Sequence, residues 1–137
     1  MSEQPAKYGY LDTSFQAAGG VEGLKNLVDD FYDQMASLEE AQKIFQMHTE
    51  ELDVIKDKLS LFLCQWLGGP KLFREKYGKI AIPMAHRHLE IGPGERDAWM
   101  LCMKKAVAKQ LNWSASFRQY FLEQIYVPAE RSRNRGD

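Results

Sequence analysis

The stretch IAIPMAHRHLEIGPGERDAWMLCM, residues 80–103, decides how this chain is interpreted. It places His86 and His88, two of the three histidines, two residues apart and just before a Gly-Pro-Gly break. After the break, apolar residues recur every three or four positions, which predicts a helix that carries Trp99. Either these histidines belong to a binding site, or they only mark the end of a short element.

Length and charge exclude several classes of protein. A chain of 137 residues is the size of one domain, and 18 basic against 19 acidic residues give a net charge of -1. We therefore expect no nucleic acid and no anionic membrane as partner. No apolar run approaches the roughly 18 residues of a membrane span, and the N-terminus lacks the apolar core of a signal peptide. We expect a cytoplasmic protein in which Cys64 and Cys102 stay reduced.

Hydrophobic periodicity predicts four long helices and no strand, and so an all-α fold. The apolar stripes cover residues 24–35, 52–66, 99–111 and 117–125. Cys64 falls on the other face of the second stripe, so we expect a partly exposed thiol. The sequence predicts one domain over residues 1–137, with an N-terminal extension over about 1–15 and a flexible tail over about 129–137. An anion-binding patch of arginines is the alternative for that tail.

Several catalytic chemistries lack their motifs. Two positions apart on a helix, His86 and His88 point about 200° away from each other, so they share a metal only in an extended segment. The chain also lacks the H-E-x-x-H motif of zinc proteases, the G-x-S-x-G elbow and the glycine-rich phosphate loops. One chemistry needs a single histidine, namely axial ligation of haem iron. The 7 Phe, 6 Tyr and 3 Trp are compatible with a large planar guest or with plain core packing.

A set of short motifs carries a resemblance to a known family. In chain order they are Gly19-Gly20, Phe31-Tyr32, Trp66-Leu67-Gly68-Gly69-Pro70, Met84-Ala85-His86, Ile91-Gly92 and Glu95-Arg96-Asp97-Ala98-Trp99 with Cys102-Met103. Together, at compatible spacing over about residues 10–127, they resemble the group II truncated haemoglobins. The resemblance implies a truncated globin, a two-over-two α-helical sandwich around haem b.

The resemblance also implies roles for single residues. His86 matches the proximal ligand of the iron, whereas His88 does not. Tyr32 and Trp99 match the distal hydrogen-bond donors. Five apolar residues match the walls of the haem pocket: Phe45, Ile55, Leu59, Phe62 and Leu63.

The sequence departs from the family pattern in three places. Ala85 replaces a frequent arginine, Phe73 a frequent tyrosine and Ile80 a frequent proline. The first two family residues commonly serve the haem propionates, so other basic residues must do so here. The candidates are Lys71, Arg74, Lys79 and Arg87.

A five-coordinate haem implies binding of O₂, NO, CO or peroxide. Tyr32 and Trp99 would hold O₂ firmly, which favours redox chemistry such as NO detoxification with an unidentified reductase. The alternatives are a peroxidase-like enzyme, a ligand sensor, and a cofactor-free helical interaction module. Ile55 offers no distal imidazole, and His48, the spare candidate for a sixth ligand, is expected to be a solvent-exposed loop residue. We expect a monomer or a weak homodimer.

Overall fold

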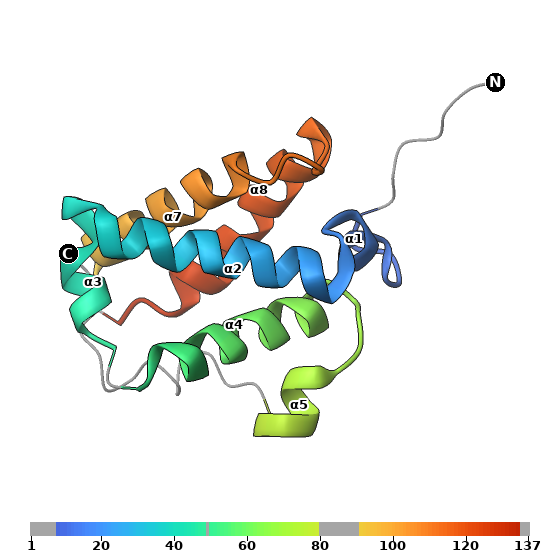
Figure 1. The fold of residues 1–137 in the computed structure, drawn as a ribbon, viewed down its shortest axis with the longest axis horizontal. Coiled ribbons are helices and arrows are strands. Elements are labelled where there is room, and N and C mark those ends of the chain that lie inside the picture. The colour runs from blue at the N-terminus through green and yellow to red at the C-terminus, as the bar shows by residue number, and fades with distance from the viewer. Residues whose placement is uncertain (1–7, 49, 80–90, 135–137) are drawn as a thin grey trace.

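The computed structural model describes residues 8–48, 50–79 and 91–134, which contain helices and no strand. The predicted all-α class is therefore confirmed (Figure 1). In chain order the elements are α1 (Thr13–Ala17), α2 (Gly20–Ser37), the 3₁₀ turn η1 (Glu39–Ala41), α3 (Gln42–Gln46), α4 (Leu52–Trp66), α5 (Leu72–Tyr77), α7 (Pro93–Ala108) and α8 (Ala115–Arg131).

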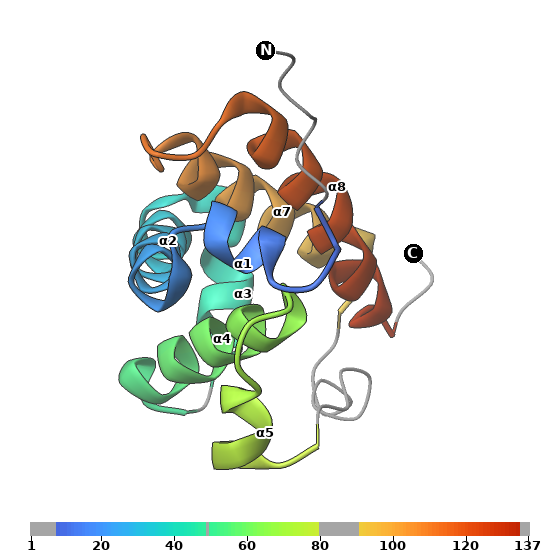
Figure 2. The ribbon, with the colours of Figure 1, turned by 90° about the vertical axis from the view of Figure 1, so that its right-hand side faces the viewer.

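The four long helices form two layers. Helix α2 packs on α4 within one layer and on α7 of the other, where α7 packs in turn on α8 (Figures 1 and 2). The spacing of the apolar residues in α2 explains its central position, because Leu24, Leu27 and Phe31 recur on one face and are 0% exposed. This is the two-over-two sandwich that the family resemblance implied.

The chain before α2 belongs to the fold from Tyr8 onward, so the extension expected over residues 1–15 is too long. Phe15 is 8% exposed, and its backbone N–H donates to the carbonyl oxygen of Leu67 at 3.2 Å. The indole nitrogen of Trp113 donates to the carbonyl oxygen of Ala18 at 3.0 Å. Helix α1 has only five residues, too few for hydrophobic periodicity to reveal it.

Gly68, directly after α4, has a steric explanation. Its φ of +90° lies in the left-handed region, and a Cβ atom there would stand 1.9 Å from the carbonyl oxygen of Leu11. Both facts require glycine. This part of the Gly68-Gly69-Pro70 motif therefore serves the close approach of the N-terminal segment to the end of α4.

Two apolar positions differ from the sequence prediction. Leu111, expected on an inward stripe, is 87% exposed because α7 already ends at Ala108. Cys64, expected to be partly exposed, is 0% exposed in the core. Burial raises the pKa of the Cys64 thiol, and it raises that of Cys102 to about 11. Both side chains are free thiols and behave as small core residues.

Helix α8 continues past Pro128 into residues that were expected to belong to the flexible tail. Its last residue is Arg131, and Ala129 beyond the proline is 9% exposed. Proline inside a helix costs about 3 kcal/mol, so contacts beyond it must offset the lost hydrogen bond. Residues 129–131 are therefore helical rather than part of the flexible tail expected from 129. Among the described residues, no helix is long and apolar enough to cross a membrane.

Candidate functional site

Tyr32 lies on the buried face of α2. Its side chain is 6% exposed, and its ring packs edge-on against Phe31, with centroids 4.9 Å apart. Within the described ranges, the structure gives its hydroxyl no hydrogen bond. Burial raises the pKa of Tyr32 above its ordinary value, so the phenol keeps its proton and serves as a donor. A donor without a protein partner is available to a ligand.

Trp99, on α7, reaches the same aromatic cluster from the other layer. Its ring centroid lies 4.9 Å from that of Phe31, so Phe31 contacts both Tyr32 and Trp99. Trp99 is half-buried, and no residue in the described parts of the chain accepts a hydrogen bond from its indole nitrogen. The structure thus brings the two donors named from the sequence to one place between α2 and α7.

Helix α4 presents two apolar faces. One face is in the core, where Leu63 and Cys64 are 0% exposed. The other consists of Ile55, Leu59, Phe62 and Trp66, spaced four, three and four residues apart, and all of them are half-buried. The rings of Phe62 and Trp66 stack at 6.2 Å, and Trp66 meets Phe121 of α8 edge-on at 6.1 Å. We call these four residues the α4 stripe; Leu63, also expected in the pocket, lies on the core face.

Two further rings lie at the end of α3 and in the turn after it. Phe45 is half-buried against the core. His48, expected in a solvent-exposed loop, is half-buried as well, with its ring centroid 5.8 Å from that of Tyr32. Its Nδ1 donates to the carbonyl oxygen of Phe45 at 3.3 Å when that nitrogen carries the ring proton. The expectation for His48 is wrong because the turn after α3 folds back onto α2, which hydrophobic periodicity does not predict.

The candidate propionate partners lie at or beside α5. Lys71, Arg74 and Lys79 are exposed, and among the described residues their side chains make no ion pair. They are therefore available to a carboxylate. Asp57 of α4 accepts hydrogen bonds from Lys76 at 2.7 Å and from the Tyr77 hydroxyl, which fastens α5 to α4 and lowers the pKa of Asp57.

Some of the predicted site lies outside the described residues. This is the case for the iron ligand His86, for Arg87 as a propionate partner, and for His88, Ala85 and Ile80. The assignments to His86 and Arg87 stay predictions.

The described residues fit a haem group. An apolar macrocycle needs an apolar wall, which the α4 stripe and Phe45 provide, and donors at its open side, which Tyr32 and Trp99 provide. In the described ranges the buried polar residues are Ser14, Ser60 and Gln110, and no charged side chain is buried. The surroundings of Tyr32 are thus suited to an uncharged planar ring system.

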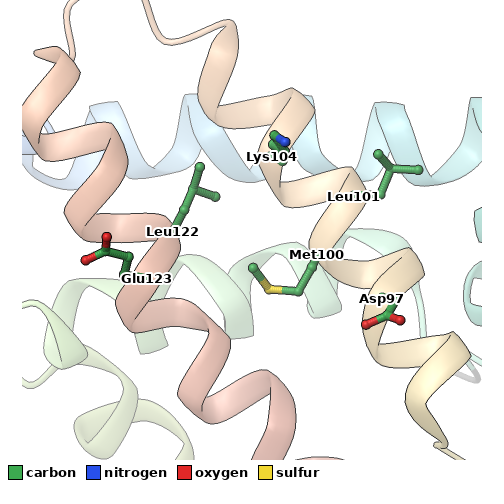
Figure 3. Close-up of a pocket in the computed structure, with 6 residues that line it drawn as sticks. All are labelled: Asp97, Met100, Leu101, Lys104, Leu122 and Glu123. Carbon is green, nitrogen blue, oxygen red and sulfur yellow. The ribbon is translucent and has the colours of Figure 1, made fainter.

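A groove between α7 and α8 lies elsewhere. In Figure 3 the residues of this groove are seen on α7 and α8, with α2 and α4 behind these two helices. None of the predicted site residues lines it; the lining consists of Asp97, Met100, Leu101, Lys104, Leu122 and Glu123. The groove is therefore separate from the Tyr32 site.

Comparisons with known proteins agree with this geometry. The family model for bacterial-like globins matches residues 13–126. A group 2 truncated hemoglobin of Bacillus subtilis (strain 168) is 32% identical over 127 residues, covering 90% of this chain and 93% of that protein.

Solved structures are similar too. A cold-adapted truncated hemoglobin from Pseudoalteromonas haloplanktis TAC125 is 31% identical with a TM-score of 0.84, covering 89% of this chain and 98% of that one. A truncated oxygen-avid haemoglobin from Bacillus subtilis is 29% identical with a TM-score of 0.78, covering 88% of this chain and 98% of that one.

Proposed function

We propose a dioxygen-binding role for this chain, which belongs to the bacterial-like globin family and is therefore a haem protein that binds small ligands. Haem b held by one imidazole supplies an iron atom with one open position for a diatomic ligand. We assign that imidazole to His86 and the open side to Tyr32 and Trp99. The observation that carries the proposal is the cluster in which Phe31 contacts both of these donors.

The two donors act on the charge of the ligand. When bound, a haem group would shift negative charge onto a diatomic ligand, and the Tyr32 hydroxyl and the Trp99 indole N–H would stabilise that charge by hydrogen bonds. A hydrogen bond to a charged group contributes about 1.5 to 3 kcal/mol. Each donor then slows dissociation about ten- to a hundredfold. One structural relative is described as oxygen-avid, which supports this behaviour.

Tight binding favours consumption of the ligand over its delivery. We assign to this protein the conversion of NO and O₂ to nitrate. This reaction also consumes one electron, which an unidentified reductase must return. The α4 stripe excludes water from the ligand, and Ile55 has no group that transfers protons. The pocket is thus arranged to hold O₂ against protonation until NO arrives. NO and CO are further ligands of the same site.

One observation favours a second candidate function. His48 lies against the ring of Tyr32, and imidazole is the side chain best suited to exchange protons near neutral pH. A peroxidase-like reaction needs such an exchange to cleave peroxide. His48 would supply the proton and Tyr32 would hold the peroxide oxygen.

Stopped-flow mixing separates the two functions. The oxygenated protein should consume NO stoichiometrically within the mixing time and form nitrate, and Tyr32→Phe should lose O₂ faster in the same instrument. Peroxide turnover should be slow and should fall further in His48→Leu. Slow NO consumption together with fast, His48-dependent peroxide turnover would reverse the assignment.

The proposal also covers the cellular location and the oligomeric state of the protein. Cys64 and Cys102 are free thiols, as is usual in the reducing cytoplasm, where we place the protein. We assign it as a monomer or a weak homodimer. Analytical ultracentrifugation over a hundredfold range of concentration tests this assignment, since a stable oligomer would not dissociate on dilution.

A further inference from the structure

The last described residues pair with the residue that precedes α7. The backbone N–H of Asn134 donates to the carbonyl oxygen of Ile91 at 2.8 Å, and the backbone N–H of Ile91 donates to Oδ1 of Asn134 at 2.9 Å. Both backbone groups of Ile91 are thus satisfied by one residue that is 43 positions away in the chain. Such a pair fixes the position of Ile91 relative to the end of α8.

A second connection lies in the first turns of α7. Arg96 donates to one carboxylate oxygen of Glu130, and Arg133 donates to the other at 2.7 Å. The Arg96 guanidinium also lies over the ring of Tyr126, with its carbon 5.4 Å from the ring centroid. The side chain of Arg96 is only 17% exposed and that of Glu130 32% exposed, so water screens this pair less than a surface pair.

These contacts lie at the start of α7, the helix that carries Trp99. Ile91 is five residues after His86, and Arg96 is three residues, almost one helical turn, before Trp99. We propose that residues 130–134 form a C-terminal latch that positions the haem site by fixing Ile91 and the start of α7, and with it Trp99. This inference rests on the role proposed above for Trp99.

The start of α7 is stabilised locally by Pro93 at its first position and by one capping contact with Glu95. Gly92 precedes the helix without a capping side chain, and its backbone N–H donates to Glu95 at 2.9 Å. Glu95 in turn forms one ion pair with Lys43 of α3 at 3.5 Å, where the lysine side chain is 62% exposed. Without the latch, the first turn of α7 would open more often, and the Trp99 indole would lose its alignment with a ligand.

Two shortened chains test the latch directly. A chain of residues 1–134 keeps every residue of the latch, whereas a chain of residues 1–131 keeps the whole of α8 but lacks Arg133 and Asn134. With haem bound, the 1–131 chain should show faster amide hydrogen exchange in residues 91–96 than the 1–134 chain. It should also release O₂ about two- to thirtyfold faster, the range typical of residues that act through a neighbouring element.

Substitutions provide a test that does not shorten the chain. Glu130→Gln removes the charge that Arg96 and Arg133 share, and it should raise exchange in residues 91–96 and speed transfer of haem to apomyoglobin. Glu50→Gln is the matched control, because it breaks an ion pair of similar length, with Lys58 at 2.8 Å, away from α7. The control should leave both readouts unchanged.

The outcomes separate this inference from the proposed function. Equal exchange and equal O₂ release in the 1–134 and 1–131 chains would overturn the latch, and so would faster exchange with unchanged O₂ release and haem transfer. A failure of the proposed function would instead appear in the full-length chain, where His86→Ala would retain haem. Amide exchange in the 1–134 and 1–131 chains as purified reports on the latch in either case.

Discussion

Replacing Tyr32 by phenylalanine should change ligand release and stability in different ways. The ring keeps its contacts with Phe31 at 4.9 Å and with His48 at 5.8 Å, so packing is preserved. The lost hydroxyl has no hydrogen-bond partner among the described residues. The free energy of unfolding of the ligand-free protein should therefore stay the same or rise by up to about 1 kcal/mol. In the ligand-free protein, the Tyr32 hydroxyl therefore adds nothing to the free energy of unfolding.

Dioxygen dissociation should respond strongly to the same change. Loss of one hydrogen bond to a charged ligand, about 1.5 to 3 kcal/mol, corresponds to about ten- to a hundredfold faster release. The assay is stopped-flow displacement of O₂ by CO, beside urea unfolding of both proteins. Because burial raises the pKa of Tyr32, wild-type release should show no phenol titration up to about pH 10, the ordinary tyrosine value. Unchanged release in a stably folded Tyr32→Phe protein would refute the reasoning.

Three further predictions concern other parts of the molecule. Trp99→Phe should speed O₂ release, whereas Trp113→Phe should leave release unchanged and lower the free energy of unfolding by at least about 1 kcal/mol, since only Trp113 donates to the backbone at Ala18. Gly68→Ala should lower that free energy by more than about 2 kcal/mol in urea unfolding, whereas Gly94→Ala, whose Cβ would meet nothing within 4 Å, should be tolerated. Arg96 and Arg133 lower the pKa of Glu130. The ionised Glu130 therefore contributes fully to the free energy of unfolding above about pH 4.3, and this contribution is lost as the pH falls through the lowered pKa. In unfolding measured against pH, Glu130→Gln should lose less stability in acid than the wild type.

The long helices could be predicted from sequence because each buries one regular stripe. Leu24, Leu27 and Phe31 recur at helical spacing and are buried as expected. Tyr32 and Trp99 could be named because their motifs are local in the chain. Their meeting at Phe31 depends on how α7 crosses α2, a tertiary relation that periodicity does not contain.

Short elements and long-range pairs could not be predicted in this way. Helix α1 is too short to show a period, and the contact of His48 with Tyr32 depends on a turn that folds back. The pairing of Asn134 with Ile91 joins residues 43 positions apart, and one of its two hydrogen bonds uses only backbone groups, which every residue has. The sequence of a polar, arginine-rich chain end does not show whether that end packs on the fold or extends into solvent. Pro128 added to the error, because tertiary contacts keep α8 helical beyond it.

Visible absorption of two purified variants tests the central claim, that one imidazole at position 86 holds the haem, most directly. His86→Ala should be purified without haem or lose it readily, with a weak or absent Soret band, while His88→Ala should keep a full complement and the wild-type spectrum. A His86→Ala protein with an unchanged haem spectrum, or a colourless His88→Ala protein, would contradict the account.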